Sequence, residues 1–296
     1  MKRRTYIYTP EKRDDFGEGV EKKNRKIPSN YKYIHTNIFY RAISFLIYYL
    51  VAIPVLYLVG KLFYRVKVKN RKVLKQLKNT GYFIYSNHTL WVDGFSQHIF
   101  TARPKRTIVV SLADTFVASK GLAVILGMLG AFPLPGDFRS AKNFLKGMEY
   151  YLNKNYCFVI YPEGTIWPYY TKQRPVKPGS FKYPRVFSKP VVFACTTYRK
   201  PKGLFKHFLK PGMTITLSEI YDPSRNSNEK FDEKRLEKEY VQFIERTSSD
   251  LDNYSANDYV PKQIERDYLD EAIQSYNIDY QTKVDLKVSE ILKDDK

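Results

Sequence analysis

One stretch of the chain limits its possible folds more than any other, because 19 consecutive residues from Ala42 to Gly60 carry no charge. The stretch reads AISFLIYYLVAIPVLYLVG and is close to the length that crosses the hydrocarbon layer of a bilayer. A surface helix of a soluble domain would show a polar stripe, which this stretch lacks. A buried core helix is the alternative, but the pattern favours a membrane-associated helical segment at residues 36–65.

The flanks of this segment are basic on both sides. Positions 22–41 hold six Lys and Arg, positions 61–80 hold eight, and neither range holds an acid. The positive-inside rule therefore favours neither orientation. Pro54 offers a break, so we predict a helical hairpin that dips into one leaflet and leaves both flanks and the main domain on the cytoplasmic face. A tilted single span is the alternative.

The formal charge of the 296-residue chain is +20, and it is unevenly placed. Residues 1–221 hold 38 basic and 11 acidic side chains, whereas residues 222–296 hold 12 and 19. The basic part should seek an anionic partner. Because basic residues stand beside an apolar anchor, the pattern indicates anionic membrane lipid rather than nucleic acid. Residues 1–35 have no apolar run of the kind that makes a signal peptide, and we interpret them as a basic surface arm.

Residues 66–221 alternate between short apolar runs and polar stretches of helical length. This rhythm predicts one α/β domain with a central, mostly parallel mixed sheet flanked by helices. Phe144, Met148 and Leu152 fall at helical spacing and predict a helix over 140–152 that packs on the sheet. The runs predicted as strands are YFIYS from Tyr82, TIVVSLA from Thr107, YCFVIYP from Tyr156, PVVFACT from Pro190 and MTITLSEI from Met213.

The C-terminal part, residues 222–296, reads as a charged helical extension. Leu236, Tyr240 and Ile244 share one helix face, and Pro261 is suited to open another helix. Elsewhere, the two cysteines of the chain both lie in predicted strands and are interpreted as core residues. The sequence has neither a disulfide framework nor a zinc-ligand spacing, so we expect no metal.

The stretch YSNHTLWVDGF holds His88 and, five positions on, Asp93, which is the first acid after Glu21. On a regular helix this separation leaves the two side chains about 140° apart, so they cannot pair on one face. They can meet if His88 lies in the turn after the strand YFIYS and Asp93 on the following helix, with Ser86 or Asn87 near its cap. Ligands bind at such carboxyl ends of strands. An imidazole oriented there by a carboxylate can take a proton from an alcohol.

A second motif, YPEGTIW, directly follows the apolar run YCFVI and so occupies the same kind of position on another strand. Gly164 allows the backbone to approach a ligand closely, while Glu163 offers an acceptor and Thr165 a hydroxyl. A plain turn is the alternative for this motif alone. Two such motifs after two strands are hard to obtain by accident.

With these two motifs, residues 60–220 resemble the glycerolipid acyltransferase family, which includes 1-acylglycerol-3-phosphate acyltransferase. The resemblance implies that His88 and Asp93 form the catalytic dyad. It further implies transfer of a fatty acyl group from acyl-CoA or acyl-carrier protein to a lysophospholipid hydroxyl, without a cofactor. The expected acceptor is 1-acylglycerol-3-phosphate, which gives phosphatidic acid. Another lysophospholipid or a glycerol phosphate is the alternative acceptor.

The resemblance also implies an acceptor site. Its Glu-Gly-Thr motif helps to bind the acceptor and is matched by Glu163, Gly164 and Thr165, and Asn87 beside the dyad histidine is a further candidate contact. IW after the motif departs from the polar residues that usually follow it in the family.

The blocks that hold the acceptor phosphate in the family are matched less closely. LGAFPLPGDFR, from Leu129, resembles the block whose arginine holds this phosphate, but Gly136 stands at that position and Arg139 is the nearest substitute. Lys177 opens KPGSFKYPRVFSKPVVFA, which resembles the last block except that Phe193 replaces a proline, and it is the second candidate phosphate contact.

Two other classes of function compete with acyl transfer. A lipid hydrolase would use Ser86 or Thr165 as the nucleophile with His88 as its base, but the sequence has no Gly-x-Ser-x-Gly elbow. A non-catalytic protein that binds anionic membranes would explain the charge. It would not explain why both motifs follow strands.

Overall fold

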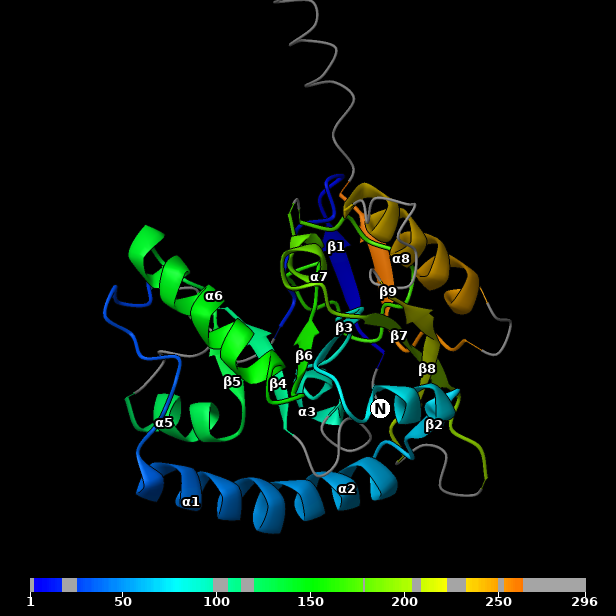
Figure 1. Ribbon diagram of the computed structural model, residues 1–296. Helices are drawn as coiled ribbons and strands as arrows, with labels where there is room; N and C mark the ends of the chain where they lie inside the picture. The colour runs from blue at the N-terminus through cyan, green and yellow to red at the C-terminus, as the bar shows by residue number, and fades with distance from the viewer. Residues whose placement is uncertain are drawn as a thin grey trace, which may run out of the picture.

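The structure is a computed structural model, and it describes residues 3–17, 26–97, 106–112, 120–177, 179–203, 209–222, 233–249 and 253–262. A seven-stranded sheet forms its centre, in the order β2-β8-β7-β3-β6-β4-β5 (Figure 1). All neighbouring strands are parallel except β7 and β8, which are antiparallel. The predicted α/β class with a mostly parallel mixed sheet is therefore confirmed. The strands are β2 (Lys67–Lys69), β3 (Tyr82–Ser86), β4 (Thr107–Ser111), β5 (Ala131–Pro133), β6 (Cys157–Ile160), β7 (Val191–Arg199) and β8 (Gly212–Tyr221).

The five apolar runs singled out in the sequence all form strands of this sheet, and their apolar side chains supply much of the core. Every residue of β3 and β6 is buried, and both cysteines lie in the core as expected. The sequence pattern did not reveal β2 and β5. Each has only three residues, which is too short for a periodicity to stand out.

Helices pack on both faces of the sheet. α6 (Phe138–Leu152) begins at a capping box between Asp137 and Ser140 and buries Phe144 and Met148 against the sheet. This agrees with the helix expected at 140–152. α8 (Glu233–Ser248) packs on β7 and brings Leu236, Tyr240, Phe243 and Ile244 into the same core cluster. The start of the C-terminal extension is thus part of the fold. The shorter helices are α3 (Asp93–Ser96), α5 (Lys120–Met128) and α7 (Lys182–Phe187), with a 3-10 helix, η2, at Arg71–Leu77.

The apolar segment forms one continuous helix, Ile38–Leu62, so the predicted hairpin is wrong. The helix consists of α1 (Ile38–Leu46), a π-helical turn η1 (Ile47–Ala52) and α2 (Ile53–Leu62). In the π turn the Ile53 amide donates to the Tyr48 carbonyl, five residues back. Because the wider turn directly precedes Pro54, it accommodates the proline without breaking the helix.

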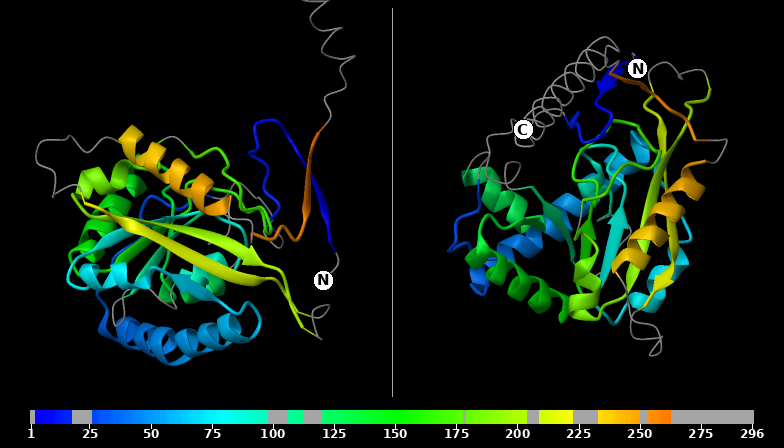
Figure 2. Two further views of the ribbon diagram at one scale, coloured as in Figure 1. Left: turned by 90° about the vertical axis from the view of Figure 1, so that its right-hand side faces the viewer. Right: turned by 90° about the horizontal axis from the view of Figure 1, so that it is seen from above.

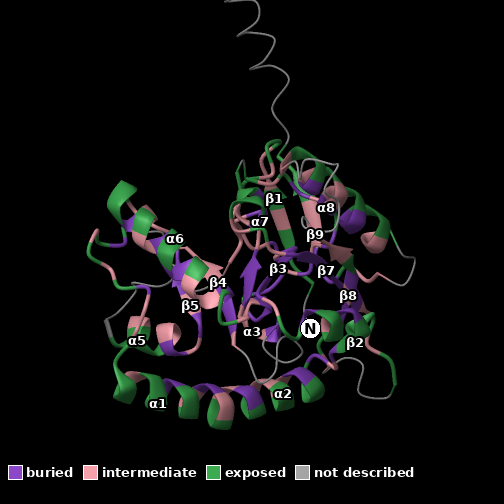
Figure 3. Ribbon diagram, in the orientation of Figure 1, coloured by how far each residue is buried: buried purple, intermediate pink, exposed green. Residues whose placement is uncertain are grey.

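This long helix lies lengthwise along the foot of the domain, with α1 and α2 end to end (Figure 1). Near its start Ser44 donates to the Met128 carbonyl at 3.0 Å, and just beyond its end the Met213 amide donates to the Tyr64 carbonyl at 2.7 Å. Only 17% of the most apolar 18-residue stretch of this helix is buried, and much of the helix surface is exposed (Figure 3). Large exposed apolar side chains of the helix include Ile38, Phe39, Phe45, Leu46, Leu50, Val51, Val55, Leu58 and Leu62.

The N-terminal segment differs from the expected surface arm. Its strand β1 (Thr5–Tyr8) pairs in parallel with β9 (Asp258–Pro261), and the two form a small sheet of their own (Figure 2). Further along, Ile27 and Tyr33 are 1% and 4% exposed and belong to the main core. Pro261 ends a strand here, and the helix that it was expected to open lies outside the described residues.

Candidate active site

His88 and Asp93 come together as the turn-and-helix interpretation predicts. His88 lies in the loop that follows β3, and Asp93 is the first residue of α3. The distance between His88 Nδ1 and Asp93 Oδ2 is 3.4 Å. The Asp93 side chain is fully buried, whereas 17% of the His88 side chain is exposed. The imidazole is thus the accessible member of the pair and can meet a substrate.

The loop between the two residues fixes the Asp93 carboxylate. Its Oδ2 accepts hydrogen bonds from the Thr89 amide at 2.5 Å, the Leu90 amide at 2.7 Å and the Thr89 hydroxyl at 3.1 Å. A carboxylate held in this way orients the imidazole and favours the tautomer with the proton on Nδ1. In that tautomer Nε2 carries the lone pair that can act as a base.

The His88 loop is also held from its other side, by the loop that follows β6. The His88 amide donates to Glu163 Oε2 at 3.0 Å, and its carbonyl accepts from Arg174 Nη2 at 3.1 Å and from the Trp167 amide at 3.3 Å. The imidazole stacks on Tyr161, with 4.2 Å between ring centroids. The two sequence motifs therefore form one unit through backbone contacts.

Glu163 and Arg174 form a buried ion pair at the centre of this unit, each with a side chain 1% exposed. Arg174 also donates to the Thr165 hydroxyl and to the Thr165 carbonyl, both at 2.7 Å. Burial raises the pKa of Glu163, and the neighbouring Arg174 guanidinium opposes that shift. The contacts of the Glu163 carboxylate are thus to the His88 amide and Arg174. These contacts organise the motif, and the acceptor contact suggested for Glu163 from the sequence stays a prediction.

The sequence pattern did not identify Arg174 as a functional residue. It is one of 50 basic residues and belongs to neither motif, so no local pattern distinguishes it from a solvated surface charge. Its burial among two backbone carbonyls, a hydroxyl and a carboxylate depends on how the two loops meet. The ring of Trp167 adds a further contact, 5.2 Å from the guanidinium carbon.

Gly164 has a backbone conformation and surroundings that require glycine. Its φ is +67°, and a Cβ built on it would lie 2.4 Å from Lys177 Cε. The Lys177 amide donates to the Pro162 carbonyl at 2.8 Å, which holds the lysine beside the motif. Gly164, Thr165 and Lys177 all line a cavity beside His88, and their contact with a substrate stays a prediction.

The remaining candidates lie outside the described lining of the cavity. Asn87 is buried, and its side chain donates to the Thr196 carbonyl at 3.0 Å and accepts from the Thr196 amide at 2.7 Å, so it ties the His88 loop to β7. Ser86 is fully buried and outside the described cavity lining, which disfavours it as a hydrolase nucleophile. Arg139 is exposed in the first turn of α6 and is likewise absent from that lining.

A cavity of about 470 Å³ opens beside His88, a volume in the range of small-molecule sites. Its lining is mostly apolar and comes from α3, β4, the α5–β5 region and α7, together with the loop that holds His88. The apolar lining includes Trp91, Phe95, Val109, Val110, Leu112, Leu126, Leu129, Leu134, Ile160, Ile166 and Tyr183. The polar lining includes Asp15, Ser111, Thr165, Lys177, Ser180 and Lys182. Such a cavity can hold a long apolar chain and place its polar end at the imidazole.

Asp15 and Gly17 bring the N-terminal segment to this cavity. The Asp15 carboxylate accepts from the Ile166 amide at 3.0 Å, and the Phe16 amide donates to the Ile166 carbonyl at 2.9 Å. The Trp167 indole donates to the Asp14 carbonyl at 2.7 Å. The segment therefore forms one wall of the site. Within the described ranges, no group of three or more His, Cys, Asp and Glu is placed to hold a metal ion.

Comparison with known proteins gives one family. Residues 65–195 match the family model described as Acyltransferase. No curated protein matches the sequence. Among solved structures, the 1-acyl-sn-glycerophosphate (LPA) acyltransferase PlsC from Thermotoga maritima is similar, with 18% sequence identity and a TM-score of 0.48. The similarity covers 71% of this chain and 89% of that protein.

Proposed function

Residues 65–195 match the acyltransferase family model, and on this premise we propose that the chain is an acyltransferase that moves a fatty acyl group to the free hydroxyl of a lysophospholipid. The donor is a thioester, either acyl-CoA or acyl-carrier protein. The proposed acceptor is 1-acylglycerol-3-phosphate, and the product is phosphatidic acid. The observation that carries the proposal is the His88 imidazole, which is paired with Asp93 and lines a mostly apolar cavity.

In this reaction His88 Nε2 takes the proton of the acceptor hydroxyl as its oxygen attacks the thioester carbonyl. A carbon–oxygen bond forms and the carbon–sulfur bond breaks, and the proton on the imidazole passes to the departing thiolate. Asp93 orients the ring and stabilises the imidazolium while it carries the proton. General base catalysis of this kind contributes on the order of 10² to 10⁴ in rate. The attacking hydroxyl belongs to the acceptor, so no covalent acyl-enzyme forms.

We assign the acceptor phosphate to the cations in the cavity lining. Lys177 and Lys182 both line it, and Lys177 lies against Gly164. Arg139 is absent from the described lining, so we assign the phosphate to Lys177 in preference to Arg139. The apolar lining takes the acyl chains, whose burial supplies most of the binding free energy.

The long helix supports a membrane-bound site on one leaflet. A helix of 25 residues is about 37 Å long, and this one is attached to the domain near both ends. Spanning the bilayer in this pose would draw the domain in with it, whereas lying in the interface buries only the exposed apolar face. The basic flanks then meet anionic headgroups, and we place the domain on the cytoplasmic face. Trp91 is 62% exposed and lines the cavity, so the entrance would lie at the membrane surface.

The decisive experiment supplies labelled acyl-CoA or labelled acyl-carrier protein together with a panel of lysophospholipids and glycerol 3-phosphate. We expect labelled phosphatidic acid from 1-acylglycerol-3-phosphate, and no product from His88→Ala. A product only with another acceptor would move the proposal to that acceptor. Release of free fatty acid, or an acyl group trapped on the wild-type protein, would instead support a hydrolase.

A further inference from the structure

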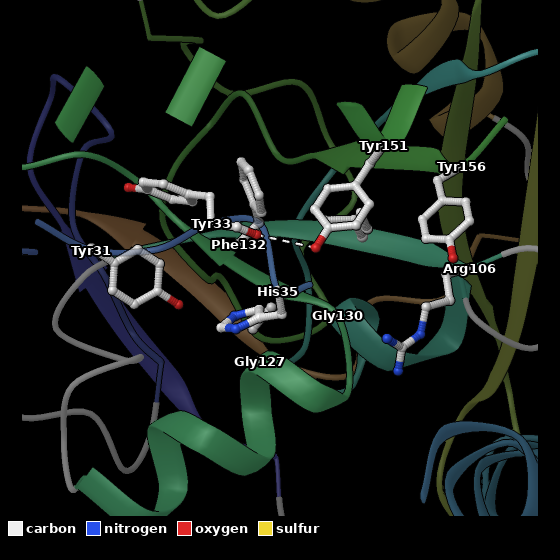
Figure 4. A pocket seen from close by; sticks show the side chains of 11 residues that line it. Tyr31, Tyr33, His35, Arg106, Gly127, Gly130, Phe132, Tyr151 and Tyr156 are labelled. Carbon is white, nitrogen blue, oxygen red and sulfur yellow. Dashed lines mark hydrogen bonds between the residues drawn. The ribbon is translucent and has the colours of Figure 1, made fainter. Parts of the chain in front are cut away.

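A second pocket lies where the segment before α1 meets the start of β4, the end of α5 and the end of α6 (Figure 4). Among the described residues it shares only Ala131 with the catalytic cavity. Its wall is formed by four tyrosines, Tyr31, Tyr33, Tyr151 and Tyr156, together with Phe132, and its polar groups include Arg106 and His35. It is therefore a separate, strongly aromatic pocket whose lining includes the positively charged side chain of Arg106.

The cation of Arg106 has no acidic partner in this pocket. Its Nη2 donates to the Ser44 carbonyl at 3.0 Å, to the Ser44 hydroxyl at 2.7 Å and to the Met128 carbonyl, which are all neutral acceptors. Its Nε is buried and has no hydrogen-bond partner, and no acidic side chain lines the pocket among the described residues. Arg106 is half-buried, and a cation that is partly withdrawn from water without a counter-charge is costly, so the site favours an anion.

The size of the pocket limits that anion to a small group. The volume is about 40 Å³, which holds a few atoms of the size of water and excludes an acyl chain. The oxygens of a phosphate group fit this space, with the rest of the ligand outside. His35 lies between Tyr31 and Arg106, and the Tyr156 hydroxyl is on the Arg106 side (Figure 4). Burial lowers the pKa of His35, so at neutral pH its ring is uncharged and offers one N–H donor.

The position of the pocket indicates where the anion comes from. Arg106 is attached to α1 through Ser44, and it stacks over the ring of Tyr48 on the same helix at 4.6 Å. The exposed face of this helix is the apolar surface that we place in the bilayer interface. Tyrosine rings are enriched at that depth, where one end is apolar and the other is wet. A phosphate beside α1 would thus belong to a lipid of the surrounding leaflet.

We propose that the pocket around Arg106 binds the phosphate group of an anionic membrane lipid, separately from the acceptor site. The proposal goes beyond acyl transfer and depends only on the placement of α1 at the bilayer. Bound lipid would neutralise Arg106 and hold the start of the long helix against the sheet. Free inorganic phosphate has the same chemistry, so the test must separate the two sources.

The test measures how the full chain partitions onto vesicles of phosphatidylcholine with and without phosphatidylglycerol. Loss of one surface charge lowers binding to anionic vesicles by about fivefold, since each basic residue contributes about 1 kcal/mol. We expect no more than this for the control Arg41→Gln, because Arg41 is exposed on α1. For Arg106→Gln we expect a larger loss, since a site contact is removed as well as a charge.

A second variant, Gly127→Leu, tests the pocket without changing the charge of the protein. Gly127 lines this pocket from α5 but is absent from the described lining of the catalytic cavity, and leucine is a good helix former. The substitution fills the pocket and leaves the net charge unchanged. We expect it to lose the preference for anionic vesicles to about the same extent as Arg106→Gln. Acyl transfer to a detergent-solubilised acceptor should stay at the wild-type rate, so this outcome is independent of the proposed reaction.

Two results would overturn the proposal. One is a wild-type vesicle preference in Gly127→Leu together with an Arg106→Gln loss no larger than that of Arg41→Gln. The other comes from equilibrium dialysis with inorganic phosphate. If phosphate binds the wild type but not Gly127→Leu while vesicle binding is unchanged, the source is free phosphate and the lipid assignment is wrong. Thermal unfolding of each variant checks that the fold is retained.

Discussion

Replacing Arg174 by methionine would test whether the ion pair with Glu163 holds the site together. The substitution removes the guanidinium and its contacts with Glu163, Thr165 and the His88 carbonyl, while it keeps an apolar stem of similar length. Both charges are about 1% exposed, so solvent does not screen the change. Removing one partner of such a pair costs about 3–5 kcal/mol, since the other charge stays buried and unpaired. We expect the free energy of unfolding to fall by this amount at neutral pH.

The loss should shrink as the pH falls. Burial already raises the pKa of Glu163 in the native protein, and removing Arg174 takes away the effect that opposes this shift. In the variant, the folded protein therefore binds a proton at Glu163 more readily than the unfolded chain does. Acidification through the raised folded-state pKa restores stability, because the folded state gains this proton first. Denaturant unfolding of Arg174→Met over a pH series measures the effect.

A matched control and a double variant show whether the stability change of Arg174→Met comes from the buried ion pair. Arg185 forms a 3.0 Å ion pair with Glu233 at the surface, where the two side chains are 61% and 31% exposed. Arg185→Met should cost no more than about 1 kcal/mol. Adding Glu163→Gln to Arg174→Met should recover part of the stability, because the buried charge is then gone. A cost below about 1 kcal/mol for Arg174→Met, without pH dependence, would refute the assigned role of the pair.

The same substitution should lower catalysis, mainly through kcat. Without Arg174 the His88 carbonyl loses a donor, and a displacement of about 1 Å in a catalytic group can cost on the order of 100-fold in rate. The Michaelis constant for the acyl donor should change little, since Arg174 is outside the described lining of the cavity. A variant that stays folded and keeps wild-type kcat would show that His88 is positioned without this arginine.

Three further predictions follow from the site and the helix. His88→Ala should lower the transfer rate by on the order of 10² to 10⁴ in folded protein, and retention of most activity would contradict its role as the base. Lys177→Ala should weaken acceptor binding by roughly 10- to 150-fold, measured as the acceptor Michaelis constant at fixed donor, whereas Arg139→Ala should leave that constant unchanged. Chemical labelling on sealed and opened vesicles should report Lys12 and Lys72 on the same side. Labelling from opposite sides would show that the helix spans the membrane.

The parts of the fold that the sequence determined are those whose signal is local. A run such as CFVI is apolar throughout because both faces of β6 are buried, and the spacing of Phe144, Met148 and Leu152 reports the buried face of α6. The pairing of His88 with Asp93 could also be predicted, since a strand, a turn and the start of a helix place them together over a few residues. In these cases the structure depends on residues that lie close to one another in the sequence.

The state of the apolar segment was only partly predictable. Its composition indicated a membrane helix, and the helix is present. Whether Pro54 breaks it depends on whether a wider turn forms upstream, and the local pattern does not encode this. The π turn ending at Ala52 is compatible with contacts that hold Ser44 and Tyr48 against the domain, so tertiary packing decides between a hairpin and one helix.

Only the tertiary structure decided which charges belong to the site. Arg139 was favoured for its nearness to a motif and lies exposed on α6, whereas Arg174 was overlooked and is buried against the His88 loop. Strand β1 likewise pairs with β9 some 250 residues away, at Thr5 opposite Asp258. A sequence pattern reports the burial and periodicity of neighbours along the chain. The position of a lone charge or of a terminal strand depends on which distant segments the fold brings beside it, and that is settled only when the sheet and its loops assemble.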